Sequence, residues 1–209
     1  MKSFKQFFVE REEGKAVAFA YGRFNPPTIG HEKLIDTVIQ TAKAHGADYF
    51  IIPSKSSAKQ TPAERKKNPL SLQERTAILK YMVPNPDAIV DFGATFIDAL
   101  KKFQEMGYTT VYHIAGSDRE QSFMIPVNKY NGKPDQSGNI PFHFQDYVFI
   151  SAGQRDPDSE GVEGMSASKL RQLAVDGDYE TFKTGMSQSV PDNLKKQAFE
   201  TIRKMSTKQ

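Results

Sequence analysis

The feature that most constrains the fold of this chain is a strand-to-helix junction near its N-terminus. Residues 17–21 are an apolar run typical of a buried strand, and Gly22 and the pair Pro26–Pro27 end this run. Apolar residues then recur with helical spacing from Leu34 to Ala42. The sequence therefore predicts a turn that leads into a helix N-terminus, where free N–H groups and partial positive charge suit a phosphate.

Two side chains at this junction could act on a phosphate. Thr28 and His31 stand at the start of the helix, and His31 can donate a hydrogen bond to a phosphoryl oxygen. Gly30 would let a ligand approach the main chain closely. Taken alone, a Thr and a His are explained more simply by a capped turn with an exposed imidazole. The choice between these two interpretations depends on the rest of the chain.

Strand and helix patterns alternate along the sequence. The predicted strands cover residues 16–21, 48–53, 88–91, 109–115 and 146–151, and the predicted helices cover residues 32–44, 71–82, 95–106, 166–175, 179–185 and 191–205. This alternation predicts an α/β fold, a Rossmann-like parallel sheet with helices on both faces, followed by C-terminal helices. Polar segments at residues 54–70, 125–145 and 152–164 are expected to be long loops. Ligands of such sheets bind beyond the carboxyl ends of the strands.

Composition limits the class of protein. The chain has 209 residues, enough for one domain with a good core, and we divide it into an N-terminal extension (1–14), a main domain (15–175) and a C-terminal helical segment (176–209). Residues 3–12 could add a short amphipathic helix packed on the body. No apolar run approaches a membrane span, so we expect no membrane partner. A net charge of +3 is too small to predict binding to nucleic acid.

The absence of Cys excludes disulfides and thiolate metal sites. It fits a cytoplasmic protein, as does an N-terminus without the apolar region of a signal peptide. The segment after the second strand is locally basic, which suits either a solvated loop or a loop that meets polyphosphate; its cations are Lys55, Lys59, Arg65, Lys66 and Lys67. His113 lies inside a predicted strand, where we expect a packing role.

A second anion-binding pattern occurs near residue 166. Ser166 or Ser168 can cap the helix that follows, and Arg171 lies one turn along it. Hydroxyl groups, free N–H groups and a guanidinium would together form a cradle for an anion. A capped amphipathic helix without a ligand is the plainer explanation of this segment alone.

Two further segments carry polar residues after predicted strands. Residues 68–75 read Asn-Pro-Leu-Ser-Leu-Gln-Glu-Arg, in which Ser71 and Glu74 form a capping box. Residues 116–118 read Gly-Ser-Asp and follow the strand at 109–115 directly. The second segment is equally well explained as a helix N-cap.

Together these segments resemble the nucleotidylyltransferase superfamily. Gly22-Arg23-Phe24-Asn25-Pro26 followed by Thr28-x-Gly30-His31 is similar to its first motif, (His/Thr)-x-Gly-His, and residues 166–171 are similar to its second, Ser-(Ser/Ala)-(Ser/Thr)-x-x-Arg. The Gly-Arg-Phe-x-Pro form and residues 68–75 are most like archaeal-type nicotinamide mononucleotide adenylyltransferases. Thr28 departs from that subfamily, which has His there, and looks like phosphopantetheine adenylyltransferase.

The resemblance implies a role for each motif residue. His31 and Thr28 would act on the α-phosphoryl group. The implied nucleotide contacts are Gly22, Arg23, Phe24, Gly30, Lys55, Gly116, Asp118, Ser166, Ser168 and Arg171. Asn68 and Arg75 would contact the substrate, or Arg75 would organise the phosphate site. The resemblance implies Mg²⁺ carried mainly by the triphosphate, since no carboxylate cluster marks a dedicated metal site.

The function implied is transfer of a nucleotidyl group, AMP from ATP in the favoured case, to a phosphorylated acceptor such as nicotinamide mononucleotide. A cytidylyltransferase or a phosphopantetheine adenylyltransferase-like enzyme is the enzymatic alternative. A non-catalytic nucleotide- or RNA-binding module is an alternative of another class, which the joint presence of His31, Ser168 and Arg171 disfavours. The sequence leaves the base, the acceptor and a homo-oligomeric state open.

Overall fold

The fold is built on one parallel sheet. The computed structural model describes residues 14–55, 60–153 and 165–207. Its strands are β1 (Lys15–Gly22), β2 (Asp48–Pro53), β3 (Tyr108–Ala115) and β4 (Asp146–Ser151). They pair in the order β2-β1-β3-β4, and every pairing is parallel. All four strands therefore direct their carboxyl ends to one edge of the sheet.

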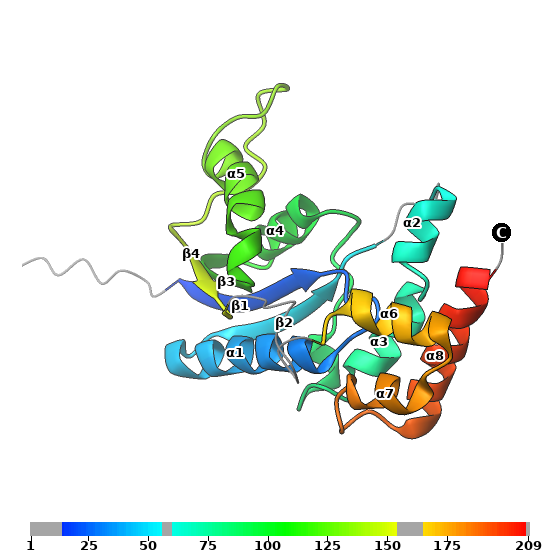
Figure 1. The fold of residues 1–209 in the computed structure, drawn as a ribbon. Helices are drawn as coiled ribbons and strands as arrows, with labels where there is room; N and C mark the ends of the chain where they lie inside the picture. Colours follow the sequence, from blue (N-terminus) through cyan, green and yellow to red (C-terminus); the bar gives the residue numbers. More distant parts are fainter. Residues whose placement is uncertain (1–13, 56–59, 154–164, 208–209) are drawn as a thin grey trace, which may run out of the picture.

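Helices cover both faces of this sheet (Figure 1). One face is covered by α1 (Ile29–His45), with α3 (Leu72–Leu79) beside β2, and the other by α4 (Phe96–Glu105) and α5 (Glu120–Tyr130). Helices α6 (Ala167–Asp176), α7 (Tyr179–Thr184) and α8 (Asp192–Thr207) pack against one another beyond the carboxyl ends of the strands. The central strand β1 is buried on both sides because Ala18 and Ala20 face the side of α1 and Val17 and Phe19 the side of α4 and α5. The predicted Rossmann-like α/β fold is confirmed.

The two cores differ in chemistry. The core under α1 is mainly aliphatic. The core under α4 and α5 is rich in aromatic rings that contact one another edge to face or stacked, including Phe19, Phe96, Phe103 and Phe123. His113 of β3 lies inside this aromatic core with no exposed surface, stacked on Phe19 at 4.6 Å between ring centroids. The packing role predicted for His113 is therefore confirmed.

Three local predictions were wrong. Residues 88–91 do not form a strand, because Pro86–Ala88 is a 3₁₀ helix that Asn85 caps, and only Ile89 bridges to β2. The expected loop at 54–70 contains α2 (Pro62–Lys67), which begins at a capping box of Thr61 and Glu64. The expected loop at 125–145 begins inside α5, which continues past Pro126.

The C-terminal helices share the aliphatic core with α1. Leu170 of α6, Phe182 of α7 and Ile202 of α8 have no exposed surface and belong to that same cluster. The boundary expected between residues 175 and 176 falls within α6. The helix expected at residues 3–12 and most of the loop expected at 152–164 lie outside the described residues. No helix within the described ranges has the length and apolar character needed to cross a membrane.

Candidate active site

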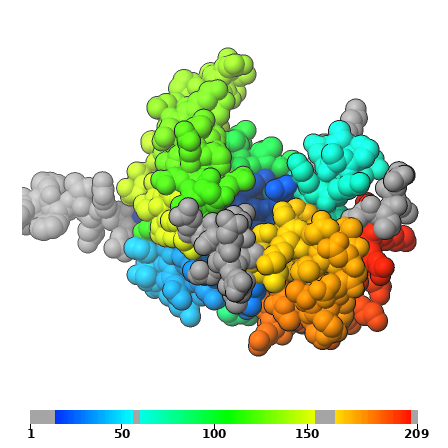
Figure 2. Space-filling view, viewed as in Figure 1, coloured from blue at the N-terminus to red at the C-terminus, as the bar shows by residue number. Residues whose placement is uncertain are grey.

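A cleft of about 310 Å³ opens at the carboxyl edge of the sheet. Figure 2 shows the surface hollowed between α5 (green) and α2 (cyan), with the chain around the end of β1 (dark blue) at the bottom. Eight of the predicted site residues line the cleft: Gly22, Arg23, Phe24, His31, Gly116, Ser166, Ser168 and Arg171. Segments that are far apart in the sequence therefore meet in one cavity.

The loop after β1 has an unusual backbone. Phe24 adopts φ 45°, in the left-handed region that a bulky residue rarely occupies. Such conformations persist where the surroundings enforce them, and they gather at functional sites. The Phe24 ring packs against the His31 ring, with 4.9 Å between centroids. The turn therefore fixes one face of the imidazole.

Hydrogen bonds at the start of α1 determine the tautomer of His31. The Nδ1 atom accepts the main-chain N–H of Thr28 at 2.9 Å, which places His31 in the third position of a capping box. A neutral His31 therefore carries its proton on Nε2, the nitrogen that can donate to a ligand. Thr28 is 2% exposed, does not line the cleft, and places its Oγ1 3.0 Å from the same Nδ1. Its contacts support a role in orienting His31.

Asn25 ties the same loop to the segment before α3. Its buried side chain donates to the carbonyl of Leu70 at 2.9 Å and accepts the N–H of Leu70 at 3.1 Å. This pair of hydrogen bonds satisfies both main-chain groups of Leu70 and fixes the distance between the two motifs. Asn25 was not predicted as a site residue, although it lies inside the first motif.

Arg75 of α3 holds the loop after β1 through hydrogen bonds to main-chain carbonyl groups. Its guanidinium donates to the carbonyl groups of Arg23, Ser54 and Ser71. The side chain is 1% exposed, and burial lowers its pKa. These contacts favour the expectation that Arg75 organises the phosphate site over the expectation that it holds a substrate. Asn68 lies outside the cleft and donates to the carbonyl of Glu64 at 3.1 Å.

The start of α6 forms the opposite rim. Ser166 is the N-cap and accepts the N–H of Lys169 at 3.1 Å. Arg171 donates to the hydroxyl of Ser168 at 2.9 Å and to the carbonyl of Asn25 at 2.7 Å. The guanidinium therefore joins the second motif to the first. Arg171 lies one turn along α6, beside the hydroxyl of Ser168.

The cleft is electropositive. Its lining includes Arg23, Arg119, Arg171 and His31, and no described carboxylate lines it. Burial, and secondarily the charge of Arg23, lowers the pKa of Arg171. Two guanidinium groups that disfavour each other's charge in this way are stabilised by an anion placed between them. Within the described residues, no group of three or more His, Asp or Glu residues forms a metal site.

Three other predicted site residues are not among those that line the cleft. Lys55 pairs with Asp91 at 2.9 Å. Asp118 is exposed, and its carboxylate lies over Gly116, where an added Cβ would meet Oδ1 at 2.6 Å. Gly30 faces the start of α6, since a Cβ there would lie 3.9 Å from the carbonyl oxygen of Met165. Gly30 therefore lies where the two motif helices approach each other.

Several residues that line the cleft were not predicted as site residues from the sequence. They include Tyr21, Leu34, Ser54, Arg119 and Phe123. Arg119 follows the Gly-Ser-Asp segment directly and could have been found from that position. Tyr21 and Phe123 carry no such signal, because an aromatic residue in an apolar run is usually part of a core.

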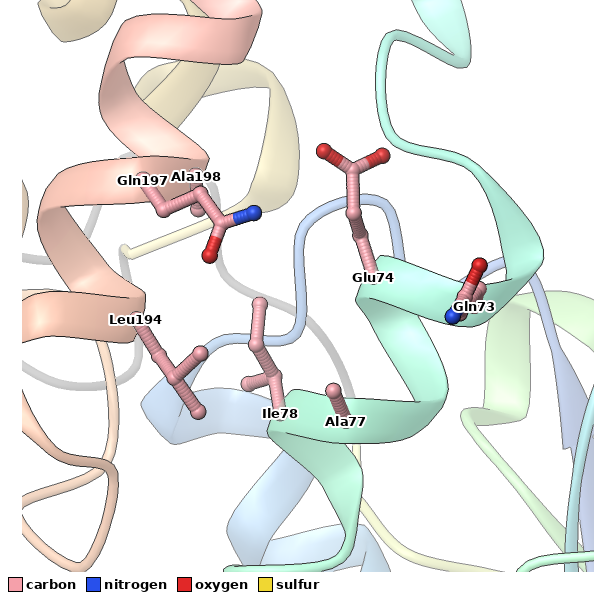
Figure 3. A pocket seen from close by; sticks show the side chains of 7 residues that line it. All are labelled: Gln73, Glu74, Ala77, Ile78, Leu194, Gln197 and Ala198. Atoms are coloured by element: carbon pink, nitrogen blue, oxygen red, sulfur yellow. The ribbon is translucent and has the colours of Figure 1, made fainter.

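A separate hollow of about 270 Å³ lies between α3 and α8 (Figure 3). Ala77, Ile78, Leu194 and Ala198 form its apolar part, and Gln73, Glu74 and Gln197 its polar part. Glu74 completes the capping box of Ser71 and also accepts a hydrogen bond from Thr201 of α8 at 3.1 Å. The contacts of Glu74 therefore explain it as a structural residue, in keeping with the capping box predicted from the sequence.

Comparison with known proteins agrees with this arrangement. No curated protein matches the chain. The family model described as cytidylyltransferase-like matches residues 19–172, which is well over half of the 209 residues and contains both motifs and the strands that carry the cleft. The chain therefore belongs to the cytidylyltransferase-like family, within the nucleotidylyltransferase superfamily.

Proposed function

We propose that this protein is a nucleotidyltransferase. It moves a nucleotidyl group, AMP from ATP in the favoured case, to a phosphorylated acceptor such as nicotinamide mononucleotide, and releases pyrophosphate. The observation that carries the proposal is the position of Arg171, whose guanidinium bonds both Ser168 and the carbonyl of Asn25. The second motif and the first-motif loop thus border one electropositive cleft together with His31.

The reaction needs little from the protein beyond positioning and charge. An oxygen of the acceptor phosphate attacks the α-phosphorus, the bond from that phosphorus to the bridging oxygen breaks, and pyrophosphate leaves with the electron pair. The attacking oxygen is already anionic, so neither a protein nucleophile nor a strong general base is required. Rate enhancement then comes from in-line alignment and from neutralising charge on the phosphoryl oxygens.

The polar residues that line the cleft have distinct roles in this scheme. His31 donates from Nε2 to an α-phosphoryl oxygen, and the Thr28 N–H keeps the other ring nitrogen occupied. Ser166, Ser168 and Arg171 hold the β- and γ-phosphates, with Arg23 as a further cation. Mg²⁺ enters bound to the triphosphate as part of the substrate.

The choice of base and acceptor rests on the motif sequences. Gly22-Arg23-Phe24-x-Pro26 and residues 68–75 support ATP and nicotinamide mononucleotide. Thr28 and the family description keep CTP, and a phosphopantetheine-type acceptor, as the alternative. Because Thr28 is buried against His31, Thr28→His should change mainly the rate and leave the base preference unaltered.

The test is turnover with a matrix of substrates. Purified protein with Mg²⁺ is incubated with ATP or CTP and with nicotinamide mononucleotide, phosphopantetheine or phosphocholine, and both pyrophosphate and the nucleotide product are measured. We expect NAD⁺ and pyrophosphate in equal amounts from ATP and nicotinamide mononucleotide. A CTP-dependent product without NAD⁺ would overturn the substrate assignment and retain the reaction class. Release of pyrophosphate from none of the pairs, with nucleotide binding intact, would favour the binding module.

A further inference from the structure

The turn between α7 and α8 contacts the helix that carries His31, although it lies beyond the residues that match the family. The match ends at residue 172, whereas the turn between the two helices spans residues 185–191. The carbonyl of Gly185 accepts the N–H of Ile29, the first residue of α1, at 2.9 Å. One of the otherwise unsatisfied N–H groups of the α1 N-terminus is therefore held by this turn.

Ser187 makes the second contact. Its side chain has no exposed surface, and its hydroxyl donates to Oε1 of Glu32 at 2.8 Å. A serine hydroxyl has one proton and accepts through its lone pairs. The N–H of Ser189 at 3.2 Å and the hydroxyl of Ser189 at 2.8 Å fill that accepting capacity. Ser187 is thus fully bonded, and it fixes the residue next to His31.

The same turn is pressed against the start of α6. A Cβ on Gly185 would lie 2.4 Å from Cγ of Met165 and 2.6 Å from Cδ2 of Leu170, which is fully buried. Glycine is therefore the residue that lets the turn reach this position. Met165 directly precedes the N-cap Ser166, so one short segment touches the first turn of α1 and the first turn of α6.

We infer that Gly185 and Ser187 are positioning residues, which set the His31 end of α1 relative to the phosphate-binding end of α6. This inference rests on the proposed function, because His31 and Arg171 must then address adjacent phosphates of one triphosphate. A small displacement of α1 would leave the contacts at α6 intact and move His31 away from the α-phosphoryl oxygen. The turn would therefore affect the rate of transfer more than the binding of triphosphate.

The variants isolate the Ser187–Glu32 contact. Ser187→Ala and Glu32→Ala each remove it, whereas Glu32→Gln keeps an oxygen that can accept the Ser187 proton. Ser189→Ala is the matched control, because it changes the same turn and leaves the contact to Glu32 in place. We expect kcat to fall about tenfold in the two disrupting variants, the scale of a modest misalignment, with Glu32→Gln and Ser189→Ala within twofold of wild type. The Kd for inorganic tripolyphosphate should change by less than threefold throughout.

Two measurements separate positioning from general stability. The double variant Ser187→Ala/Glu32→Ala should lose no more activity than either single variant, since all three lack the same bond. Hydrogen–deuterium exchange should rise at residues 28–32 in the disrupting variants and stay at the wild-type level at residues 166–171. Equal kcat in Ser187→Ala and Ser189→Ala, or a fall in kcat with unchanged exchange at residues 28–32, would overturn the inference.

The failure of the proposed function would be seen separately. It would appear as absent turnover in the wild-type protein with every substrate pair. In that event the exchange experiment still decides whether the turn holds the start of α1: selective exchange in Ser187→Ala supports that contact, and exchange equal to that of Ser189→Ala removes it.

Discussion

The two walls of the cleft are built by different physical means. On the wall formed by the starts of α1 and α6, polar side chains are fixed by main-chain groups, as Arg171 is by Asn25 and His31 by Thr28. On the wall formed by β1 and α5, the rings of Tyr21 and Phe123 meet edge to face, with 6.4 Å between their centroids. The exposed Arg119 lies over the Phe123 ring, with its Cζ 5.6 Å from the ring centroid. The first wall presents hydrogen-bond donors whose orientation is fixed, and the second presents aromatic surface with one exposed cation.

The difference between the walls suggests that one wall relates to the class of reaction and the other to the choice of substrate. Every nucleoside triphosphate carries the same three phosphates, so the first wall suits any of them. The base and the acceptor differ in their rings, which aromatic side chains recognise by stacking. The second wall is therefore the place where base or acceptor specificity would be determined, and substitutions on the two walls should have different kinetic effects.

The largest expected effect is at His31, on the wall formed by the starts of α1 and α6, called the phosphate wall below. His31→Ala should lower kcat by about 10²–10³-fold, the scale for losing one preorganised donor to a developing oxyanion. The affinity for nucleotide should change much less, because Ser168 and Arg171 remain. Steady-state kinetics with a nucleotide-binding titration checks both, and His45→Ala, an exposed imidazole at the far end of α1, is the control. An unchanged kcat would leave His31 with its capping role alone.

The phosphate wall was also the wall that the sequence could predict. Its residues are contiguous in two short motifs at helix starts, so type and spacing together indicate the chemistry. The sheet was predictable for a similar reason, because β2 and β4 each contain a continuous apolar run, residues 49–52 and 147–150. Arg75 shows the limit: its residue type indicated an anion contact, yet tertiary burial directs its guanidinium to three carbonyl groups.

The second wall, formed by β1 and α5, could not be predicted from the sequence. Tyr21 and Phe123 lie about a hundred positions apart, and only the pairing of β1 with β3 brings them together. The local errors have similar causes. Residues 88–91 read as a strand by composition, but capping by Asn85 favours a 3₁₀ turn, and α5 runs through Pro126 because Phe123 and Val127 are buried one turn apart.

Acid should destabilise the fold through His113 in the aromatic core. Burial lowers the pKa of His113 to about 3, and its Nδ1 lies 2.8 Å from the hydroxyl of Tyr147. The unfolded chain binds this proton near pH 6.5, so the stability present above pH 6.5 is lost as pH falls toward 3. At pH 5 the loss from this one group should be about 2 kcal/mol.

Urea unfolding at pH 7 and pH 5 measures this loss. His113→Gln keeps an amide for Tyr147 and removes the titrating group, so the difference in unfolding free energy between the two pH values should shrink by about 2 kcal/mol. His143→Gln, at an exposed position, serves as the control. An equal difference in wild type and His113→Gln would show that His113 does not govern the acid sensitivity of this core.

The geometry of Arg171 should matter as well as its charge. Arg171→Lys retains the positive charge but cannot bond Ser168 and the Asn25 carbonyl at the same time as a phosphate. We expect triphosphate affinity to fall about tenfold, the cost of one charge-assisted hydrogen bond. Titration with tripolyphosphate measures this independently of the base. Lys43→Arg, at an exposed position in the last turn of α1, should bind as wild type does.

The smallest effect should come from Arg119, and it tests the division between the walls most directly. Arg119 is exposed and packs over Phe123, so Arg119→Ala removes a cation from the rim of the cleft without unpairing a buried group. We expect a change of about threefold, the scale of an exposed cation–π or rim contact. If the second wall selects the base or the acceptor, the change should appear in the KM of one substrate, with kcat and tripolyphosphate affinity unaltered. A loss of tripolyphosphate affinity comparable to that of Arg171→Lys would instead place Arg119 among the phosphate ligands, and the two walls would then form a single anion site.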